Sequence, residues 1–489
     1  MNELSLPTSN SNKNKIRFTN DQDVAIKELL NFIDGNFDES KYIIGLTGPA
    51  GTGKTFVIKY VINKCSYSPS TIAFAASTHK SCRVLSNALD GRTVNTIQST
   101  FGFRLDLNLE DFDPENPQFN PKAKHKLDNK YTLIIDECSM LNANIVKYIE
   151  ETCKNRKIKI IYIGDESQLP PVNEKYSTAF NHCYKILRLK EIVRQNTTNP
   201  VNKLLNILRN DINYNTFDFI NVIEKYKRSS PIYYETNELG EGFTICGKER
   251  FKELIIQHFN DKDFTKDIDK YRLIAYTKNN VRYWNYFIRN NIVLNSEKSV
   301  LTKNDLLLSK VTIVNDFLEV TIQNGEEYII HEIFDFVDSK YNLTGFLVRL
   351  QAIHGGNITE PLFIINHADV NSAIKYNNIL DSLKAKASSM YGNGRAAAWK
   401  EYFNFKNKYL LITDIVTKDG KIKYSGDLDY GFALTAHRAQ GSTYKNAFID
   451  LKDILYDKSN NRYTNIAETK RLIYTAISRL SKELFIYYD

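Results

Sequence analysis

The sequence contains no apolar run that approaches the about 20 residues of a membrane-spanning helix. Residues 1–20 are rich in Ser, Asn and Lys and lack the apolar core of a secretory signal peptide. These absences argue against a membrane protein and against secretion. The sequence therefore predicts a soluble, cytoplasmic protein with no membrane partner.

Cysteine is scarce, with six in 489 residues, and no two of them form a Cys-x-x-Cys pair. No cysteine has a histidine at the spacing of a zinc site. A disulfide scaffold is therefore not expected, and the thiols should be reduced. Cys138 lies inside a motif described below, where we expect it to fill a small buried space rather than act as a nucleophile.

The net charge is +8, and 42% of the residues are hydrophobic, as in ordinary globular proteins. This mild basic excess permits a polyanionic partner such as nucleic acid but does not identify one. The length allows roughly two to four domains with sizeable cores.

The most informative segment is residues 48–55, which read GPAGTGKT. It follows an apolar, strand-like run at 42–46 and precedes a helical pattern, which is the context that a phosphate-binding loop requires. Its glycines let backbone N–H groups converge on a phosphate at a helix N-terminus. Lys54 would reach the β- and γ-phosphates, and the Thr55 hydroxyl would ligate Mg²⁺. The residues expected to surround the nucleotide are Gly48, Gly51, Thr52, Gly53, Lys54 and Thr55.

Two further strand ends carry polar groups suited to ATP hydrolysis. The strand-like run 133–137 (LIIDE) ends in Asp136, which would hold Mg²⁺ through water, and Glu137, which would polarise the attacking water. Residues 164–171 (GDESQLPP) close the next strand, and Gln168 there is expected to sense the γ-phosphate. The pattern predicts an ATP hydrolase that uses ATP and Mg²⁺.

The alternation of strands and helices predicts an α/β fold with parallel sheets. After a loose tail at 1–17, strands at 42–46, 71–76, 131–135 and 158–163 alternate with helices over 18–190, interrupted by a proline-rich insertion at 101–128. A second α/β pattern is split between 191–295 and 427–489. Between its halves lies a β-rich insertion at 296–426, with a hairpin signal at Asn324-Gly325.

The phosphate-binding loop at 48–55, the strand end with Asp136 and Glu137, and residues 164–171 resemble helicase motifs I, II and III of superfamily 1, in this order. The resemblance continues through the Q motif at 18–22 (FTNDQ), motif IV at 189–195 (LKEIVRQ), motif V at 435–443 (TAHRAQGST) and motif VI at 474–479 (YTAISR). It is greatest for superfamily 1B, the RecD-like 5′→3′ branch. It implies two RecA-like P-loop NTPase domains, a small pin insertion and a β-rich, SH3-like insertion. The implied activity is that of an ATP-dependent DNA helicase.

The resemblance also implies roles for single residues of the ATP site. Gln22 would read the adenine edge, and Gln440 would couple the nucleotide state to the grip on DNA. Arg194 and Arg479 would reach the γ-phosphate from the second domain. Two guanidiniums that act across a cleft stabilise developing charge only when the cleft closes.

For the DNA track the resemblance implies contacts in motifs Ia, Ib and V. The residues expected to bind DNA phosphates are Thr78, His79, Thr96, Ser99, Thr435, His437 and Arg438. Thr78 is alternatively a plain helix N-cap. The pin candidates that would stack on the last base pair are Phe101, Phe103, Phe112 and Phe119. Alternatively, these phenylalanines anchor the insertion to the core.

The implied partners are single-stranded DNA and single-strand/double-strand junctions, bound by a monomer. A single-strand binding protein or a replisome component is a candidate protein partner. Three alternatives stay open: a translocase that strips proteins from DNA with little unwinding, a nucleotide-gated binding module, and a motor that moves on RNA.

Overall fold

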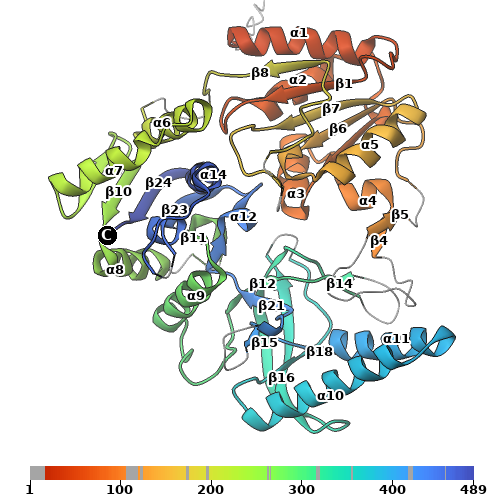
Figure 1. The fold of residues 1–489 in the computed structure, drawn as a ribbon, viewed down its shortest axis with the longest axis vertical. Helices are drawn as coiled ribbons and strands as arrows, with labels where there is room; N and C mark the ends of the chain where they lie inside the picture. The colour runs from red at the N-terminus through yellow and green to blue at the C-terminus, as the bar shows by residue number, and fades with distance from the viewer. Residues whose placement is uncertain are drawn as a thin grey trace, which may run out of the picture.

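The computed structural model describes most of the chain, and Figure 1 shows its three main parts. The described residues are 17–105, 119–121, 125–171, 174, 176–193, 198–261, 264, 266–314, 320–353, 356–416, 422–457 and 459–489. Each part is built on a six-stranded sheet. None of the helices in these ranges is long and apolar enough to cross a membrane.

The first sheet is entirely parallel and carries the phosphate-binding loop. Its order is β3-β2-β6-β7-β1-β8. The strands are β1 (Ile43–Thr47), β2 (Ile72–Ala76), β3 (Asn95–Thr96), β6 (Thr132–Asp136), β7 (Lys159–Gly164) and β8 (Lys185–Arg188). The helices are α1 (Asn20–Asp34), α2 (Lys54–Lys64), α3 (His79–Ala88), α4 (Ile97–Phe101) and α5 (Ala143–Asn155), with 3-10 turns η1 (Pro69–Thr71) and η2 (Cys138–Met140). The central strands are buried along their whole length, which explains their continuous apolar runs.

The second sheet has the order β22-β11-β23-β24-β10-β9, and β9 is an antiparallel edge strand. The strands are β9 (Tyr233–Thr236), β10 (Gly242–Cys246), β11 (Tyr271–Ala275), β22 (Ala433–Thr435), β23 (Tyr444–Asp450) and β24 (Leu480–Tyr487). Its helices are α6 (Val201–Tyr214), α7 (Asp218–Ser229), α8 (Lys248–Phe259), α9 (Lys278–Ile292), α12 (Ala436–Ala439), α13 (Leu451–Leu455) and α14 (Ile466–Ile477), with η3 (Ile268–Lys270). Two chain segments far apart in sequence thus build one domain.

The third sheet belongs to the insertion and is largely antiparallel, in the order β18-β17-β16-β15-β12-β21. Its strands are β12 (Leu306–Ser309), β15 (Glu327–Asp338), β16 (Leu343–Ala352), β17 (Leu362–Ile365), β18 (Tyr409–Leu410) and β21 (Leu428–Tyr430). Short pairs are formed by β13 (Ile313–Val314) with β14 (Val320–Ile322), β19 (Ile415–Val416) with β20 (Ile422–Tyr424), and β4 (Phe103–Leu105) with β5 (Phe119–Pro121). The helices α10 (Val370–Ser389) and α11 (Gly392–Lys408) pack on this part.

The α/β class with two RecA-like domains and insertions is confirmed, with local differences from the sequence prediction. The second half of the second α/β pattern, expected from 427, begins with two short strands, β21 in the sheet of the insertion and β22 in the second sheet, and α12 follows with its start capped by the Thr435 side chain. The insertion, expected to be β-rich, also contains the helices α10 and α11, and Gly392 at the start of α11 is in the left-handed region at φ 59°. Cys138 is fully buried, as expected, and burial raises the pKa of its thiol.

A buried ion pair joins the second domain to its insertion. Arg289 near the end of α9 donates from Nε to Asp305 Oδ1 (2.8 Å) and from Nη2 to Asp305 Oδ2 (2.9 Å). Both side chains are at most 2% exposed. The pair fixes the chain between α9 and β12, where the insertion begins.

We expect Asp305→Asn to lower the free energy of unfolding by about 3 kcal/mol, because the Arg289 charge would stay buried without its counter-ion. Urea unfolding followed by circular dichroism measures this change. The control is Arg462→Ala, which removes an ion pair whose arginine is 51% exposed and should cost less than about 1 kcal/mol. Equal unfolding midpoints for Asp305→Asn and the wild type would contradict the prediction.

Candidate functional site

The phosphate-binding loop connects β1 to α2, and its backbone conformation requires glycine. Gly51 and Gly53 have φ values of 88° and 83°, in the left-handed region that glycine adopts without strain. At Gly48, a Cβ atom would lie 2.5 Å from the Leu189 carbonyl oxygen. Lys54 Nζ donates to the carbonyls of Gly48 (2.5 Å) and Pro49 (3.0 Å), so its ammonium group lies within the loop.

Gln22 of α1 lies against this loop and holds it in place. Its Oε1 accepts from the backbone N–H of Thr19 (3.2 Å), and its Nε2 donates to the Thr52 carbonyl (3.0 Å). The Thr19 side chain accepts from the Gln22 backbone N–H in return, which completes a capping box at the start of α1. The Gln22 side chain is buried, and the hydrogen bonds at its Oε1 and Nε2 atoms fix its position.

Asp136 and Glu137 lie side by side at the end of β6. Burial, together with the neighbouring Glu137, raises the pKa of the Asp136 carboxyl well above its ordinary value. Glu137 has φ 51°, a left-handed conformation that is costly for a residue with a side chain. Among the described residues its Oε2 atom is buried without a hydrogen-bond partner. Such a concentration of buried negative charge fits a divalent cation, and the described residues hold no cluster of three or more His, Cys, Asp or Glu that would form a separate metal site.

The loop that follows β7 is attached to the second domain by hydrogen bonds with four residues of that domain. Tyr474 Oη donates to Asp165 Oδ2 (2.7 Å), and Thr475 Oγ1 accepts from the Leu169 backbone N–H (3.2 Å). The other two bonds involve backbone carbonyls: Arg471 donates to that of Gln168 (3.0 Å), and Gln440 Nε2 to that of Leu169 (3.2 Å). Arg471 also donates to the Glu166 carbonyl.

Tyr474 and Thr475 belong to the motif VI segment, but the sequence predicted no contact for either of them. Arg471 was not among the predicted site residues. A partial signal was present, because Arg471 and Thr475 are four residues apart and so share a face of α14. Gln168 itself is buried, and its Oε1 has no hydrogen-bond partner among the described residues.

Arg479 approaches Glu137 from the second domain. Its Nη1 lies 4.0 Å from Glu137 Oε1, and its side chain is 4% exposed. It donates to the carbonyls of Thr475 (3.2 Å) and Ser442 (3.4 Å), which fix the guanidinium. The structure thus brings Arg479 and Glu137 together across the cleft. The other expected arginine, Arg194, lies outside the described residues.

Three of the expected DNA contacts are threonines that cap helices. The side chains of Thr78, Thr96 and Thr435 accept from backbone N–H groups at the starts of α3, α4 and α12. The N-cap interpretation of Thr78 is therefore confirmed, and the other N–H groups of each first turn have no partner within their own helix. A Cβ atom on Gly441 would lie 2.2 Å from Ser81 Oγ, so the segments that carry Thr78 and Thr435 meet between the domains.

The remaining DNA candidates differ in their surroundings. Burial lowers the pKa of His437 and, together with Arg83, that of His79, so both imidazoles are neutral near pH 7. Arg438 is exposed. Ser99 Oγ accepts from Lys126 Nζ (2.8 Å), which brings an unexpected basic group to this segment.

The structure removes one residue from the pin candidates. Phe101 lies in α4, is fully buried and packs on Phe103 (6.2 Å between ring centroids) and Tyr148 (5.9 Å). It therefore anchors the insertion to the core and is not available to stack on a base pair. Phe103 is half-buried on Tyr148. Phe112 and the side chain of Phe119 lie outside the described residues.

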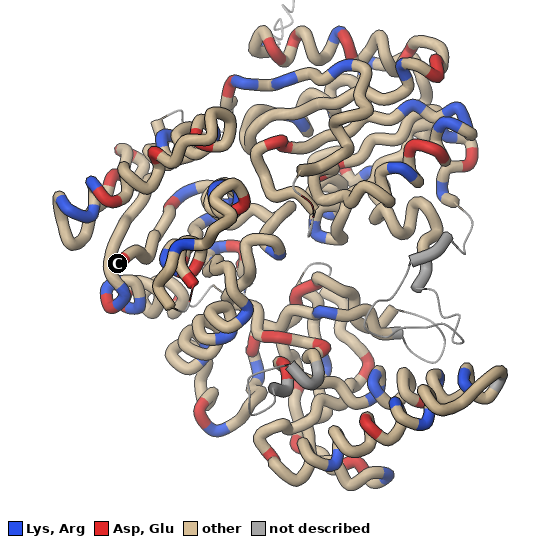
Figure 2. The backbone as a smooth tube through the Cα atoms, in the orientation of Figure 1, with Lys and Arg blue, Asp and Glu red and all other residues tan. Residues whose placement is uncertain are grey.

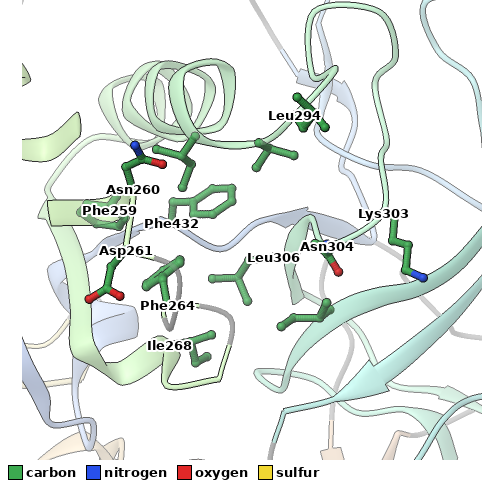
Figure 3. Close-up of a pocket in the computed structure, with 13 residues that line it drawn as sticks. Phe259, Asn260, Asp261, Phe264, Ile268, Leu294, Lys303, Asn304, Leu306 and Phe432 are labelled. Carbon is green, nitrogen blue, oxygen red and sulfur yellow. The ribbon is translucent and has the colours of Figure 1, made fainter. Parts of the chain in front are cut away.

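A separate pocket of about 320 Å³ lies where the second domain meets the insertion. Figure 3 shows apolar side chains, among them Phe264, Leu306 and Phe432, between Asp261 on one side and Lys303 on the other. None of the expected nucleotide or DNA residues lines it. We assign it no part in the site.

We expect Tyr474→Phe to lower the rate of ATP hydrolysis with saturating DNA about tenfold, because the buried Asp165 carboxylate loses a charge-assisted hydrogen bond. The KM for ATP should change little, since Tyr474 contacts the loop and not the phosphate-binding residues. Steady-state phosphate release measures both constants. The control is Tyr456→Phe, in which the lost hydroxyl contact is a 3.5 Å bond to Tyr488 elsewhere in the same domain. An unchanged rate for Tyr474→Phe would contradict the role given to this bond.

Comparison with known proteins shows which families and relatives this chain resembles. Residues 20–232 match the model of a family described as an AAA domain. The chain is 26% identical to protein R530 of Acanthamoeba polyphaga mimivirus over 96% of this chain and 99% of that protein. It is 24% identical to the ATP-dependent DNA helicase Dda of Enterobacteria phage T4, over 94% of this chain and 97% of that one.

Among solved structures, the chain can be aligned with that of a Pif1 helicase. The crystal structure of the Pif1 helicase from Candida albicans covers 97% of this chain and 95% of its own, with a TM-score of 0.47 and 17% identity. The similarity to Dda over the whole length agrees with the motifs and with the paired arginine and carboxylates of the cleft. Together, these findings support the assignment of the chain to the superfamily 1B helicases.

Proposed function

We propose that this helicase hydrolyses ATP between its two RecA-like domains and so moves 5′→3′ along single-stranded DNA, unwinding the duplex ahead of it. The observation that carries the proposal is the approach of Arg479 to Glu137, at 4.0 Å across the cleft. A site completed by two domains links each hydrolysis event to their relative motion. The direction of movement rests on the resemblance to the RecD-like branch.

The first domain supplies the groups that hold the nucleotide. The loop glycines and Lys54 would bind the phosphates, and Gln22 would contact the base beside Thr52. Thr55 and Asp136 would hold Mg²⁺, whose positive charge stabilises the phosphate oxygens during transfer. Glu137 would then accept a proton from the attacking water through its buried, unpartnered Oε2.

The second domain supplies the groups that respond to the γ-phosphate. Arg479 would stabilise the charge that develops on the phosphoryl group, and Arg194 would join it. Gln168 would sense the same phosphate, and its loop is bonded to Tyr474, Arg471 and Gln440. A change at the phosphate would therefore move α14 and the protein segment that begins at Thr435 and is proposed to contact DNA.

DNA would bind along the capped helix starts, with phosphates contacting Thr78, His79, Thr96, Ser99, Thr435, His437 and Arg438. Because His79 and His437 are neutral, they would contribute hydrogen bonds rather than charge. Phe103, Phe112 and Phe119 stay as pin candidates. The motor would act as a monomer on single strands and junctions, with a single-strand binding protein or a replisome component as its protein partner.

We expect Lys54→Ala to abolish ATP hydrolysis and to leave single-stranded DNA binding within about threefold of the wild type, because the ammonium group acts on the phosphates alone. Phosphate release and fluorescence anisotropy with labelled DNA measure the two properties. The matched control is Lys59→Ala on the same helix, which removes only a surface pair with Asp90. Hydrolysis at the wild-type rate by the Lys54 variant would refute the site.

Partial duplexes that differ only in the end carrying the single-stranded tail test the activity and its direction. We expect ATP-dependent unwinding of the 5′-tailed duplex and none of the 3′-tailed one. Unwinding from the 3′ tail alone would refute the polarity. Hydrolysis without unwinding of either duplex would refute the helicase proposal in favour of a protein-stripping translocase.

A further inference from the structure

The helix that carries the first DNA candidates is also attached to the β-rich insertion. Figure 1 shows α3 on the side of the first domain that faces the insertion, and Figure 2 shows basic positions on α3 opposite acidic positions of the insertion. Arg83 Nη1 lies 3.1 Å from Glu326 Oε1 and 3.2 Å from Glu326 Oε2. One turn earlier, Lys80 Nζ lies 3.3 Å from Glu327 Oε2. Glu326 lies in the turn between β14 and β15, and Glu327 is the first residue of β15.

The same contacts extend into the second domain. Glu327 Oε1 lies 2.8 Å from Arg272 Nη2 on β11, and Lys80 Nζ lies 3.0 Å from Asp269 Oδ1. The Tyr444 ring lies beneath both cations, 4.8 Å from Lys80 Nζ and 5.0 Å from Arg272 Cζ. Three parts of the molecule therefore share one cluster of charges.

This cluster resists separation because its centre is buried. The side chains of Arg272 and Glu327 are 0% and 3% exposed, and Lys80 is 12% exposed. A buried charge that loses its partner is strongly destabilised, so these groups stay paired while other parts of the cleft move. The two domains are thus joined through this cluster as well as through the Arg479–Glu137 contact.

The insertion is consequently held at two places. Its chain enters after α9 and leaves through β21 into β22, so its covalent connections are to the second domain alone. Arg83 and Lys80 attach it to the first domain as well. When the two domains move relative to each other, a body fixed to both of them must rotate.

We propose that Arg83 and Lys80 are positioning residues that attach the β-rich insertion to α3, so that closure of the ATP cleft rotates the insertion and drives strand separation. The proposal rests on the helicase function proposed above. These residues act through Glu326 and Glu327. Breaking the attachment should therefore uncouple unwinding from hydrolysis.

The Arg83–Glu326 pair is the place to test this attachment. Arg83 and Glu326 have side chains that are 27% and 10% exposed, so water can reach either charge when the pair is broken. Neither residue is among the nucleotide or DNA candidates. Lys80 is less suitable, because it follows His79 and lies in the buried centre of the cluster.

The variants are Arg83→Glu, Glu326→Arg and the double variant that exchanges the two charges. We expect each single variant to keep DNA-stimulated ATP hydrolysis within about twofold of the wild type but to unwind a 5′-tailed duplex about fivefold more slowly. The double variant should recover most of the unwinding rate, because the opposite charges face each other again. A purely structural role would lower hydrolysis and unwinding together.

The matched control is Arg349→Glu, which reverses one charge of an ion pair within the insertion, Arg349–Glu332, at 3.7 Å. It should leave both rates unchanged. Hydrogen exchange of amides 320–330 measures the attachment itself. We expect faster exchange in both single variants and wild-type exchange in the double variant.

If the wild type unwinds the 5′-tailed duplex and the single variants unwind it equally fast, this inference is refuted but the proposed function is not. The inference would also fail if the double variant gave no recovery or if hydrolysis fell in proportion to unwinding. A wild-type protein that unwinds neither tailed duplex would instead refute the helicase proposal, and with it the driven strand separation. Unchanged exchange of 320–330 in the single variants would refute the attachment whatever the unwinding result.

Discussion

The approach of the Arg479 guanidinium to the Glu137 carboxylate, 4.0 Å away across the cleft, is the contact on which the rest of this structure depends. Glu137 lies in a strained conformation at the end of β6, and Arg479 is fixed by the carbonyls of Thr475 and Ser442. In the proposed mechanism neither domain would hold a complete hydrolytic site by itself, so each hydrolysis event would also be an event between the domains.

The contacts beside this pair explain how such an event would spread. The loop at 165–169 belongs to the first domain by sequence, yet Tyr474, Arg471, Thr475 and Gln440 bind it from the second. The charge cluster around Lys80 also joins the two domains to the insertion. In the proposed mechanism, domains that are joined at this cluster would close by rotation rather than by approach of whole domains.

Much of the fold was predictable because it depends on local patterns. The central strands of a covered parallel sheet are apolar along their length, and Gly51 and Gly53 are required by their left-handed backbone conformation. The errors also have local causes. The prediction of a β-rich insertion at 296–426 missed the helices α10 and α11 within it. Phe101 was a candidate for stacking because the sequence of an insertion does not show whether an aromatic residue in it is buried.

The α/β class, the phosphate-binding loop with Lys54, and the carboxylates Asp136 and Glu137 could be predicted from the sequence, because each depends on residues that are neighbours in the chain. The contacts of Arg479 with Glu137, of Thr475 with Leu169, 306 residues away, and of Arg83 with Glu326 became evident only in the folded chain. Pairings over such separations leave no periodicity in the sequence. They follow from how the sheets pack, which is set by the burial of many side chains together.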